Sequence, residues 1–213
     1  MTATNNQVLQ ELNARWNELL ASYRVNQSVA EEEFEAIVTG YTEPHRYYHT
    51  LHHLYHLFTE LDACQPISKE TLWAVWYHDF VYQPGATTNE KKSTVRAAKF
   101  LNKLGADKSS IDRVITLINA TKYHQSDFQD IELQFFLDAD MAILGSDKEI
   151  YQDYCKAVRR EHKSIPAMLF NRGRKKFLAS VLAQPSIFMS DIFREKYELA
   201  ARQNIEEELQ LLP

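Results

Sequence analysis

Five of the chain's eight histidines fall within a stretch of twelve residues. They are His45, His49, His52, His53 and His56. Residues three and four apart share one face of an α-helix, so a helix through this stretch would place these imidazoles in a single stripe. Any one of them alone is most simply interpreted as exposed. Because imidazole is the commonest protein metal ligand and titrates near neutral pH, the cluster predicts a metal site or a site of proton transfer.

A second pair of candidate ligands follows an aromatic run. Residues 73–77 read Trp-Ala-Val-Trp-Tyr, and His78 and Asp79 come directly after them. Burying an imidazole and a carboxylate costs on the order of several kcal/mol unless partners are supplied. A metal ion would be such a partner. The alternative is a pair at a helix end that is solvated or bonded to the backbone.

Two carboxylates interrupt another apolar segment. Asp138 and Asp140 lie within 131–144, which is otherwise apolar enough to be buried. Residues two apart on a helix diverge, so the two carboxylates are expected to have different tasks. One is predicted to bind metal, and the other to anchor a ligand histidine through its second ring nitrogen. The alternative is a pair of acids in the first turn of an exposed helix.

Two further candidates lie between these segments. Glu90 follows a loop predicted at 80–88, and it is either the carboxylate of a capping box with Thr87 or a group that orients an attacking water. His124 follows another predicted helix. It is either a ligand of a second metal or a phosphate contact, or it is a cation at a helix C-terminus.

A basic segment lies near the C-terminus. Residues 156–176 contain eight lysines or arginines and one acid, Glu161. Guanidinium groups bind phosphate oxygens bidentately, so Arg159, Arg172 and Arg174 are the best candidates for holding a phosphate. The alternative is that these charges only keep helix faces soluble.

The elements that must position these residues are predicted to be helices. Apolar residues recur at helical spacing and no segment has the pattern of a strand, which favours an all-α protein of about ten helices. One domain is expected over 1–213, with a metal-site core at about 44–145 and the helices of 146–213 packed on it. Pro44 suits a first helical turn, so the histidine-rich helix is predicted to run from there to about Ala63. Ser68 is predicted to cap the next helix.

Composition restricts the partners and the compartment. The formal net charge is -5, which argues against a general binder of nucleic acid or anionic membranes. Cys64 and Cys155 are too few for a disulfide framework, so a reducing compartment is expected. Residues 1–10 lack the apolar core of a signal peptide, and the longest apolar run, 71–77, is too short to span a bilayer. We therefore expect a soluble cytoplasmic protein.

The order of these motifs resembles the HD superfamily of metal-dependent phosphohydrolases, in which a histidine region, a His-Asp pair and a distant aspartate occur in an all-helical chain. More narrowly, four blocks are similar to successive blocks of a bacterial family of predicted HD phosphohydrolases of unassigned substrate. They are YHTLHHL at 48–54, WYHDFVY at 76–82, NEKKS at 89–93 and LDADMAILG at 137–145. Shorter matches at 151–154, 158–161 and 201–204 extend the resemblance over most of the chain.

The resemblance implies that His78, Asp79 and Asp140 bind the metal. Asp140 is selected over Asp138 because it directly follows an alanine, as the ligand aspartate of other HD proteins does. The first ligand has two candidates. By analogy with the tyrosine-histidine-asparagine block of distantly related cyclic-nucleotide phosphodiesterases, His53 would be the ligand and His49 the acid. Other alignments make His49 the ligand, and this chain has Thr50 in place of that asparagine.

The other two histidines near this block, His52 and His56, fit neither role in the family pattern. They are interpreted as surface residues.

Together these features predict an enzyme that hydrolyses a phosphate ester of a nucleotide or another small phosphorylated metabolite with a metal-activated water. Mixed imidazole and carboxylate ligation suits Mn, Fe, Co, Ni or Zn. The candidate catalytic residues are His49, Asp79 and Glu90, and the candidate substrate contacts are Asn89, His124, Arg159, Arg172 and Arg174. Two alternatives keep the same ligands. One is an HD-fold diiron oxygenase with His124 as an added ligand, and the other is a non-enzymatic binding module with a structural metal.

Overall fold

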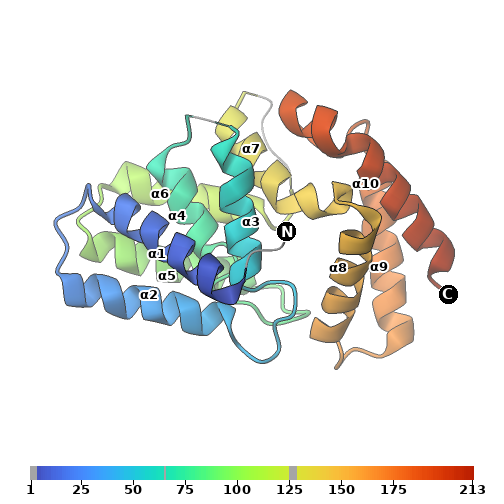
Figure 1. The fold of residues 1–213 in the computed structure, drawn as a ribbon, viewed down its shortest axis with the longest axis horizontal. Coiled ribbons are helices and arrows are strands. Elements are labelled where there is room, and N and C mark those ends of the chain that lie inside the picture. The colour runs from blue at the N-terminus through green and yellow to red at the C-terminus, as the bar shows by residue number, and fades with distance from the viewer. Residues whose placement is uncertain (1–3, 65, 125–128) are drawn as a thin grey trace. The chain divides into compact units, whose positions relative to one another are not determined.

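The computed structural model describes residues 4–64, 66–124 and 129–213. Within these ranges the regular structure is entirely helical, with ten α-helices, one short 3-10 helix and no β-strand (Figure 1). The all-α prediction is therefore confirmed. Among the same residues, no helix combines the length and the apolarity that crossing a membrane would require.

The chain divides into two compact units, Met1–Ser126 and Asp127–Pro213. The first contains α1 (Asn5–Leu20), α2 (Gln27–Tyr41), α3 (Leu51–Asp62), α4 (Lys69–Tyr77), α5 (Asn89–Lys103) and α6 (Lys108–Ala120). The second contains α7 (Ile131–Met141), the 3-10 helix η1 (Ala142–Gly145), α8 (Lys148–Glu161), α9 (Ala167–Leu182) and α10 (Asp191–Leu211). The helix α7 thus groups with the C-terminal helices. The expectation of one domain with a core at about 44–145 stays a prediction.

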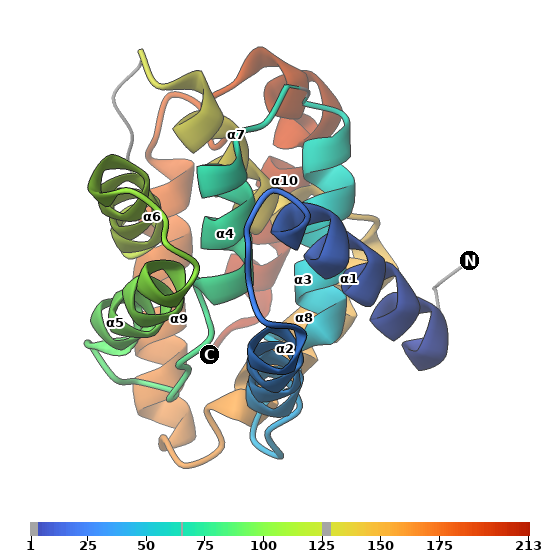
Figure 2. The same cartoon turned by 90° about the vertical axis from the view of Figure 1, so that its left-hand side faces the viewer.

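Helix α4 forms the centre of the first unit. Ser68 caps it as predicted, because its hydroxyl accepts a hydrogen bond from the amide of Thr71. Residues 73–77 are all buried, and a helix that is apolar all round belongs in a core. Its neighbours are α3, α5 and α6, and Figure 2 shows α5 and α6 running side by side. As a result α4 ends inside the unit, where its C-cap residue His78 is buried.

Aromatic rings fill the space beside α4. The ring of Trp16 from α1 lies 5.4 Å from those of Trp73 and Trp76, and 5.5 Å from that of Phe100. The two contacts with the tryptophans of α4 are edge-to-face, the arrangement that aromatic quadrupoles favour. This packing fixes the rotation of α4 and therefore the direction in which its C-terminal residues point.

The histidine-rich helix is shorter than predicted. It begins at Leu51 rather than at Pro44, and residues 44–50 form turns and bends. The N-cap residue, Thr50, has an extended backbone with φ −113° and ψ −176°. His45 and His49 therefore lie outside the helix, so the prediction of one histidine stripe on it is wrong. His53 is also buried beside Leu54, rather than on a separate polar face.

In the second unit, α10 packs on η1, α9 and α7. The buried side-chain amide of Asn204 on α10 donates to the carbonyls of Leu144 and Ser146, at 2.9 and 2.8 Å. These bonds occupy carbonyl groups at the end of η1 that the helix itself cannot satisfy. They hold α10 against the segment that follows α7.

The approach of α10 to η1 is closest at Gly145. A Cβ atom added there would lie 2.6 Å from Cβ and 2.7 Å from the carbonyl oxygen of Tyr197. We expect Gly145→Ala to lower the free energy of unfolding by about 1–3 kcal/mol, because helix backbone cannot yield as a flexible side chain does. Urea denaturation followed by circular dichroism measures this change.

Gly173 provides the matched control. It is exposed on α9, and a Cβ added to it would meet nothing within 4 Å. Gly173→Ala should raise stability by about 0.5–1 kcal/mol, since alanine has less backbone entropy to lose in a helix. Equal effects of the two substitutions would contradict the close approach at Gly145.

Candidate metal centre

The hydrogen bonding of His78 determines which of its ring nitrogens could bind a metal. It is the C-cap residue of α4 and is 1% exposed. Its Nδ1 lies 2.9 Å from the carbonyl oxygen of Val75. A carbonyl can only accept, so Nδ1 carries the proton, and Nε2 of the neutral ring carries the lone pair. Ligand histidines commonly have this hydrogen bond on their second nitrogen.

His53 and Asp79 converge on this lone pair, and His49 lies beside Asp79. Nε2 of His53 lies 3.1 Å from Nε2 of His78. Oδ2 of Asp79 lies 3.3 Å from Nε2 of His78, 3.7 Å from Nε2 of His53 and 3.8 Å from Nε2 of His49. We call these four residues the His-Asp cluster. All of them belong to the first unit.

The spacing of these atoms fits a metal ion. Ligand atoms about 2.0–2.2 Å from one metal lie roughly 3–3.5 Å from each other. The four separations given above lie between 3.1 and 3.8 Å, close to this range. The structure therefore brings together the predicted ligands His53, His78 and Asp79, with His49 beside them, in a group that could hold a metal.

The two candidate first ligands differ in exposure. The side chain of His53 is 1% exposed and that of His49 is 20% exposed. The ring of His49 is stacked on Tyr82 at 4.2 Å and meets Tyr48 edge-on at 4.9 Å. His53 thus has the buried position of a ligand. His49 lies at the accessible edge of the cluster with its ring orientation fixed by two tyrosines.

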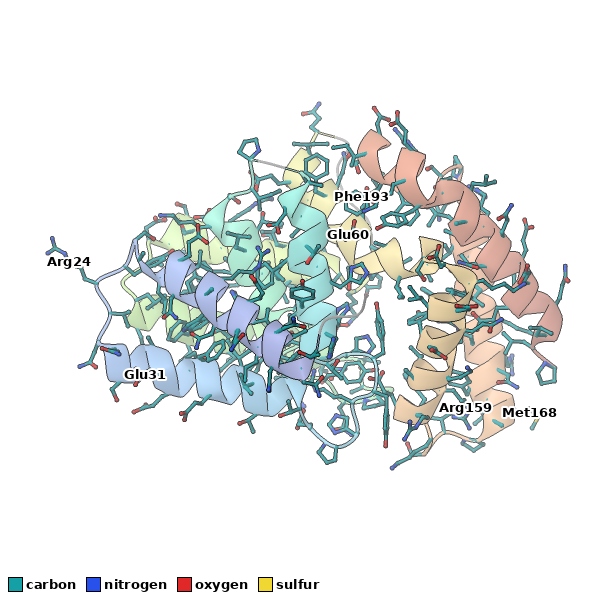
Figure 3. All side chains as sticks on the ribbon, in the orientation of Figure 1. Arg24, Glu31, Glu60, Arg159, Met168 and Phe193 are labelled. Carbon is teal, nitrogen blue, oxygen red and sulfur yellow. The ribbon has the colours of Figure 1, made fainter. Side chains whose placement is uncertain are left out.

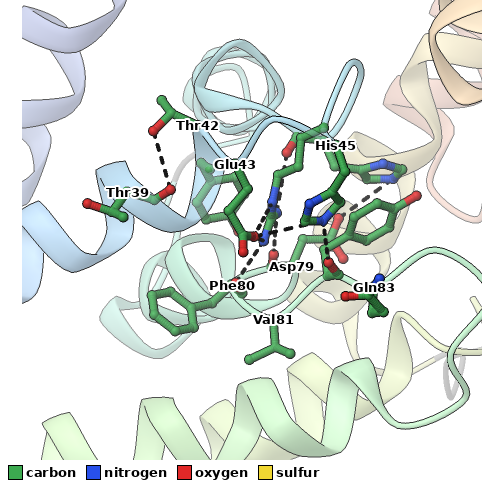
Figure 4. Close-up of polar contacts among 12 residues, drawn as sticks. Thr39, Thr42, Glu43, His45, Asp79, Phe80, Val81 and Gln83 are labelled. Carbon is green, nitrogen blue, oxygen red and sulfur yellow. Dashed lines mark hydrogen bonds and ion pairs between the residues drawn. The ribbon is translucent and has the colours of Figure 1, made fainter. Parts of the chain in front are cut away.

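Arg46 connects the two chain segments that supply the cluster, and sequence reasoning missed it. Its guanidinium donates to the carbonyls of Asp79 at 2.7 Å, Phe80 at 2.8 Å and His49 at 3.3 Å. It also donates to the carboxylate of Glu43 at 3.1 Å. In Figure 4, dashed lines mark these hydrogen bonds in the space between the labelled residues Glu43, Asp79 and Phe80. An arginine within a histidine-rich run was the only signal, and it was too weak to predict the contacts.

The other histidines of the run have separate partners. Nε2 of His45 lies 2.8 Å from the carbonyl oxygen of Tyr82 and donates a hydrogen bond to it, which ties residues 44–50 to the loop at 80–88. His52 is exposed, and its Nε2 lies 2.8 Å from Oδ1 of Asn5 on α1. His56 is exposed beside Glu60. The expectation that His52 and His56 are surface residues is confirmed.

Asp138 has a structural partner in its own unit. Its carboxylate accepts hydrogen bonds from the amides of Met189 and Ser190 at 2.8 and 2.7 Å, and from the Ser190 hydroxyl at 2.6 Å. Burial raises the pKa of Asp138, although these bonds act in the opposite direction. Asp138 therefore anchors the start of α10. Asp140, also on α7, is partly exposed, and its role as a ligand stays a prediction.

Glu90 does not belong to a capping box. The N-cap residue of α5 is Thr88, and its side chain makes no capping hydrogen bond, so the Thr87–Glu90 prediction is wrong. Oε2 of Glu90 is buried without a hydrogen-bond partner among the described residues. Lys122 lies beside it, with Nζ 3.9 Å from Oε2, and also donates to the carbonyl of Thr87.

The predicted loop at 80–88 is confirmed, and Asn89 closes it. The Asn89 side chain accepts from the amide of Gln83 at 3.2 Å and donates to its carbonyl at 3.0 Å. The hydroxyl of the buried Ser93 accepts a further bond from the amide of Val81. Asn89 thus has a structural task, and its predicted substrate contact stays a prediction.

The remaining candidates lie at helix ends or in the second unit. His124 follows α6 with φ 47°, and its amide donates to the carbonyl of Ala120. Arg159 lies at the end of α8 (Figure 3), where it donates to the carbonyls of His162 and Ile165. Arg174 is paired with Glu208, whereas Arg172 is exposed on α9. A phosphate-binding role for these residues stays a prediction.

Comparison with known proteins found no protein-family model, no curated protein and no solved structure that matches the chain. Its function is therefore inferred from the side-chain geometry and the sequence motifs.

Proposed function

We propose that the chain is a metal-dependent phosphohydrolase that cleaves a phosphate ester of a nucleotide or another small phosphorylated metabolite. The observation that supports this most is the convergence of three imidazole nitrogens on Oδ2 of Asp79, at 3.3 to 3.8 Å. Burying two imidazoles and a carboxylate together costs free energy, and a cation bound between them would offset part of that cost. The resemblance to HD phosphohydrolases supplies the reaction class.

His53, His78 and Asp79 would hold the metal, with Asp140 from the second unit as a further ligand and His49 as the alternative first ligand. The donor set fits a divalent transition metal, because imidazole and carboxylate together suit Mn, Fe, Co, Ni or Zn. When bound, such an ion polarises a phosphoryl oxygen and lowers the pKa of water. The hydrogen bond from His78 to the carbonyl of Val75 places the proton of the neutral ring on Nδ1, which leaves the lone pair of Nε2 for the metal.

The other side chains of the site would handle protons and orient the substrate. His49 is accessible, and stacking on Tyr82 limits its rotation, so it is suited to protonating a leaving oxygen. Glu90 is the candidate for orienting the attacking water, since one of its oxygens has no hydrogen-bond partner among the described residues. In this proposal Lys122 holds Glu90 near the loop at 80–88.

Phosphate release tests the proposal. The purified protein, loaded with Mn, Co or Ni, is incubated with a panel of nucleotides and sugar phosphates. We expect release of phosphate from at least one of these compounds. Asp79→Ala should reduce the rate of release by at least about 100-fold, which is more than the loss of an outer hydrogen-bond partner of a ligand typically causes. His56→Ala, which changes an exposed residue of the same histidine run, should retain the activity.

Three results would count against a phosphohydrolase. Equal release by the wild-type protein and Asp79→Ala would show that the His-Asp cluster is not catalytic. Two irons per chain with visible absorbance would favour the diiron oxygenase. A tightly bound metal without turnover of any phosphate ester would favour a structural site in a binding module.

A further inference from the structure

We propose that Arg46 is the positioning residue of the metal centre, which fastens the segment carrying His49 to the turn carrying Asp79 so that the ligands converge before a metal binds. This role rests on the proposed function, because it presupposes that the His-Asp cluster binds a metal. The hydrogen bonds of Arg46 go to backbone carbonyls and to Glu43, rather than to the side-chain atoms proposed as ligands. It therefore acts through the backbone that carries those ligands.

Arg46 forms a clamp, by which we mean its hydrogen bonds to the carbonyls of two segments, residues 44–50 and the turn at Asp79 and Phe80. One terminal nitrogen of the guanidinium donates both to the carbonyl of His49 and to that of Asp79, at 3.3 and 2.7 Å. The other donates to the carbonyl of Phe80 at 2.8 Å. Asp79 and Phe80 lie in the turn after α4, where their carbonyls need hydrogen-bond partners from outside the helix. A single side chain thus fixes the distance between the backbones of His49 and Asp79.

The guanidinium of Arg46 is buried, paired with a carboxylate and flanked by aromatic rings. The Arg46 side chain is 0% exposed, and its charge is paired with Glu43 at 3.1 Å. The guanidinium also lies over the rings of Tyr41 and Tyr82, at 4.9 and 5.4 Å. Tyr82 is the ring on which His49 stacks. Arg46 therefore supports His49 in two ways, through its carbonyl and through the tyrosine beneath its ring.

Only arginine can make this set of contacts. Its planar fork presents five N–H groups in fixed directions, whereas lysine has one nitrogen at the end of a flexible stem. A lysine could keep the charge near Glu43 but could not reach three carbonyls on two segments at once. Arg46→Lys therefore removes the clamp while preserving the buried charge.

Binding of Co²⁺ tests the positioning role without relying on turnover. The affinity is measured by calorimetry, and the visible d–d absorption of bound Co²⁺ reports the ligand geometry. We expect Arg46→Lys to bind Co²⁺ about 10- to 100-fold more weakly, the usual effect of losing an outer partner of a ligand, and to show a shifted spectrum.

Arg96→Lys is the matched control. Arg96 forms a two-bond contact with buried Glu33 in the same unit, at 2.8 and 2.6 Å, rather than with the backbone of His49 or Asp79. Its guanidinium also lies over the ring of Phe80 at 5.4 Å, and a lysine can keep this cation–π contact. The substitution should lower the thermal stability of the metal-free protein yet leave the affinity and spectrum of Co²⁺ unchanged. An equal loss in both variants would mean that Arg46 acts only through general stability, and the proposal would be wrong.

A second variant covers the case in which Arg46→Lys does not fold. Glu43 is 42% exposed, so Glu43→Gln should fold while replacing the charged partner of the guanidinium with a neutral amide. We expect a smaller loss of affinity and a change of the Co²⁺ spectrum. Wild-type affinity and an unaltered spectrum in Glu43→Gln and in any folded Arg46→Lys would overturn the role of Arg46. Absence of Co²⁺ binding by the wild-type protein would instead overturn the proposed function.

Discussion

His78→Asn is expected to abolish tight binding of transition-metal ions. The side-chain nitrogen of asparagine can take the place of the histidine Nδ1 and keep the hydrogen bond to the carbonyl of Val75. It cannot replace Nε2, the atom that lies 3.1 Å from His53 and 3.3 Å from Asp79. We expect the Kd for Co²⁺ or Mn²⁺ to rise by more than the roughly 10- to 100-fold that loss of an outer hydrogen-bond partner causes. Calorimetric titration of the metal-free protein measures it.

The control for this variant is His52→Ala. His52 comes from the same run but is exposed and lies beside Asn5 rather than beside Asp79. The affinity of His52→Ala for metal should match that of the wild-type protein. A thermal melt of each metal-free variant separates lost ligation from lost folding. Wild-type affinity in a folded His78→Asn protein would show that the His-Asp cluster is not the metal site.

Glu208→Gln is expected to lower the free energy of unfolding of the second unit by about 3–5 kcal/mol, the usual cost of removing one partner of a buried ion pair. The side chains of Arg174 and Glu208 are only 7% and 13% exposed, with 2.8 Å between Nε and Oε1. Oε2 of Glu208 also accepts from the hydroxyl of Tyr151 and the thiol of Cys155. Glutamine carries no charge to compensate Arg174. Its NH₂ group would also face groups that now donate to the carboxylate, from Arg174 or from Tyr151 and Cys155. Urea denaturation measures the loss.

The neighbouring residue supplies a control. Glu207 pairs with Lys148, but the two side chains are 50% and 60% exposed. Glu207→Gln should therefore change stability by less than about 1 kcal/mol, as is usual for surface pairs. Similar losses in the two variants would contradict the importance of the buried pair at Arg174.

The same pair predicts a dependence on pH. Burial alone would raise the pKa of Glu208, but the hydrogen bonds and charge of Arg174 lower it below its ordinary value of 4.5. A carboxylate with a depressed pKa in the folded state stabilises the fold above its unfolded pKa, and this stabilisation is lost as the pH falls through the folded value. The difference in stability between the wild-type protein and Glu208→Gln should be full at neutral pH and should shrink below about pH 4.5.

The sequence alone was sufficient where a local pattern decides the structure. The apolar run before His78 predicted a buried helix, and α4 is buried with His78 at its end. The loop predicted at 80–88, which contains Pro84 and Gly85, is also present. Helical periodicity and strong breakers act over a few residues, so they can be recognised without knowledge of the neighbouring segments.

Only the tertiary structure decided which of the histidines meet. A local pattern favoured a helix from Pro44, yet residues 44–50 form a turn that is bonded through Arg46 to carbonyls more than thirty residues later in the chain. The same holds for Arg174, whose charge predicted a phosphate contact but is paired with Glu208 on another helix. A buried guanidinium needs several acceptors, and folding brings these from distant segments. The sequence therefore determined the helices and the chemical types of the candidate ligands, and long-range hydrogen bonds determined which of those side chains share a site.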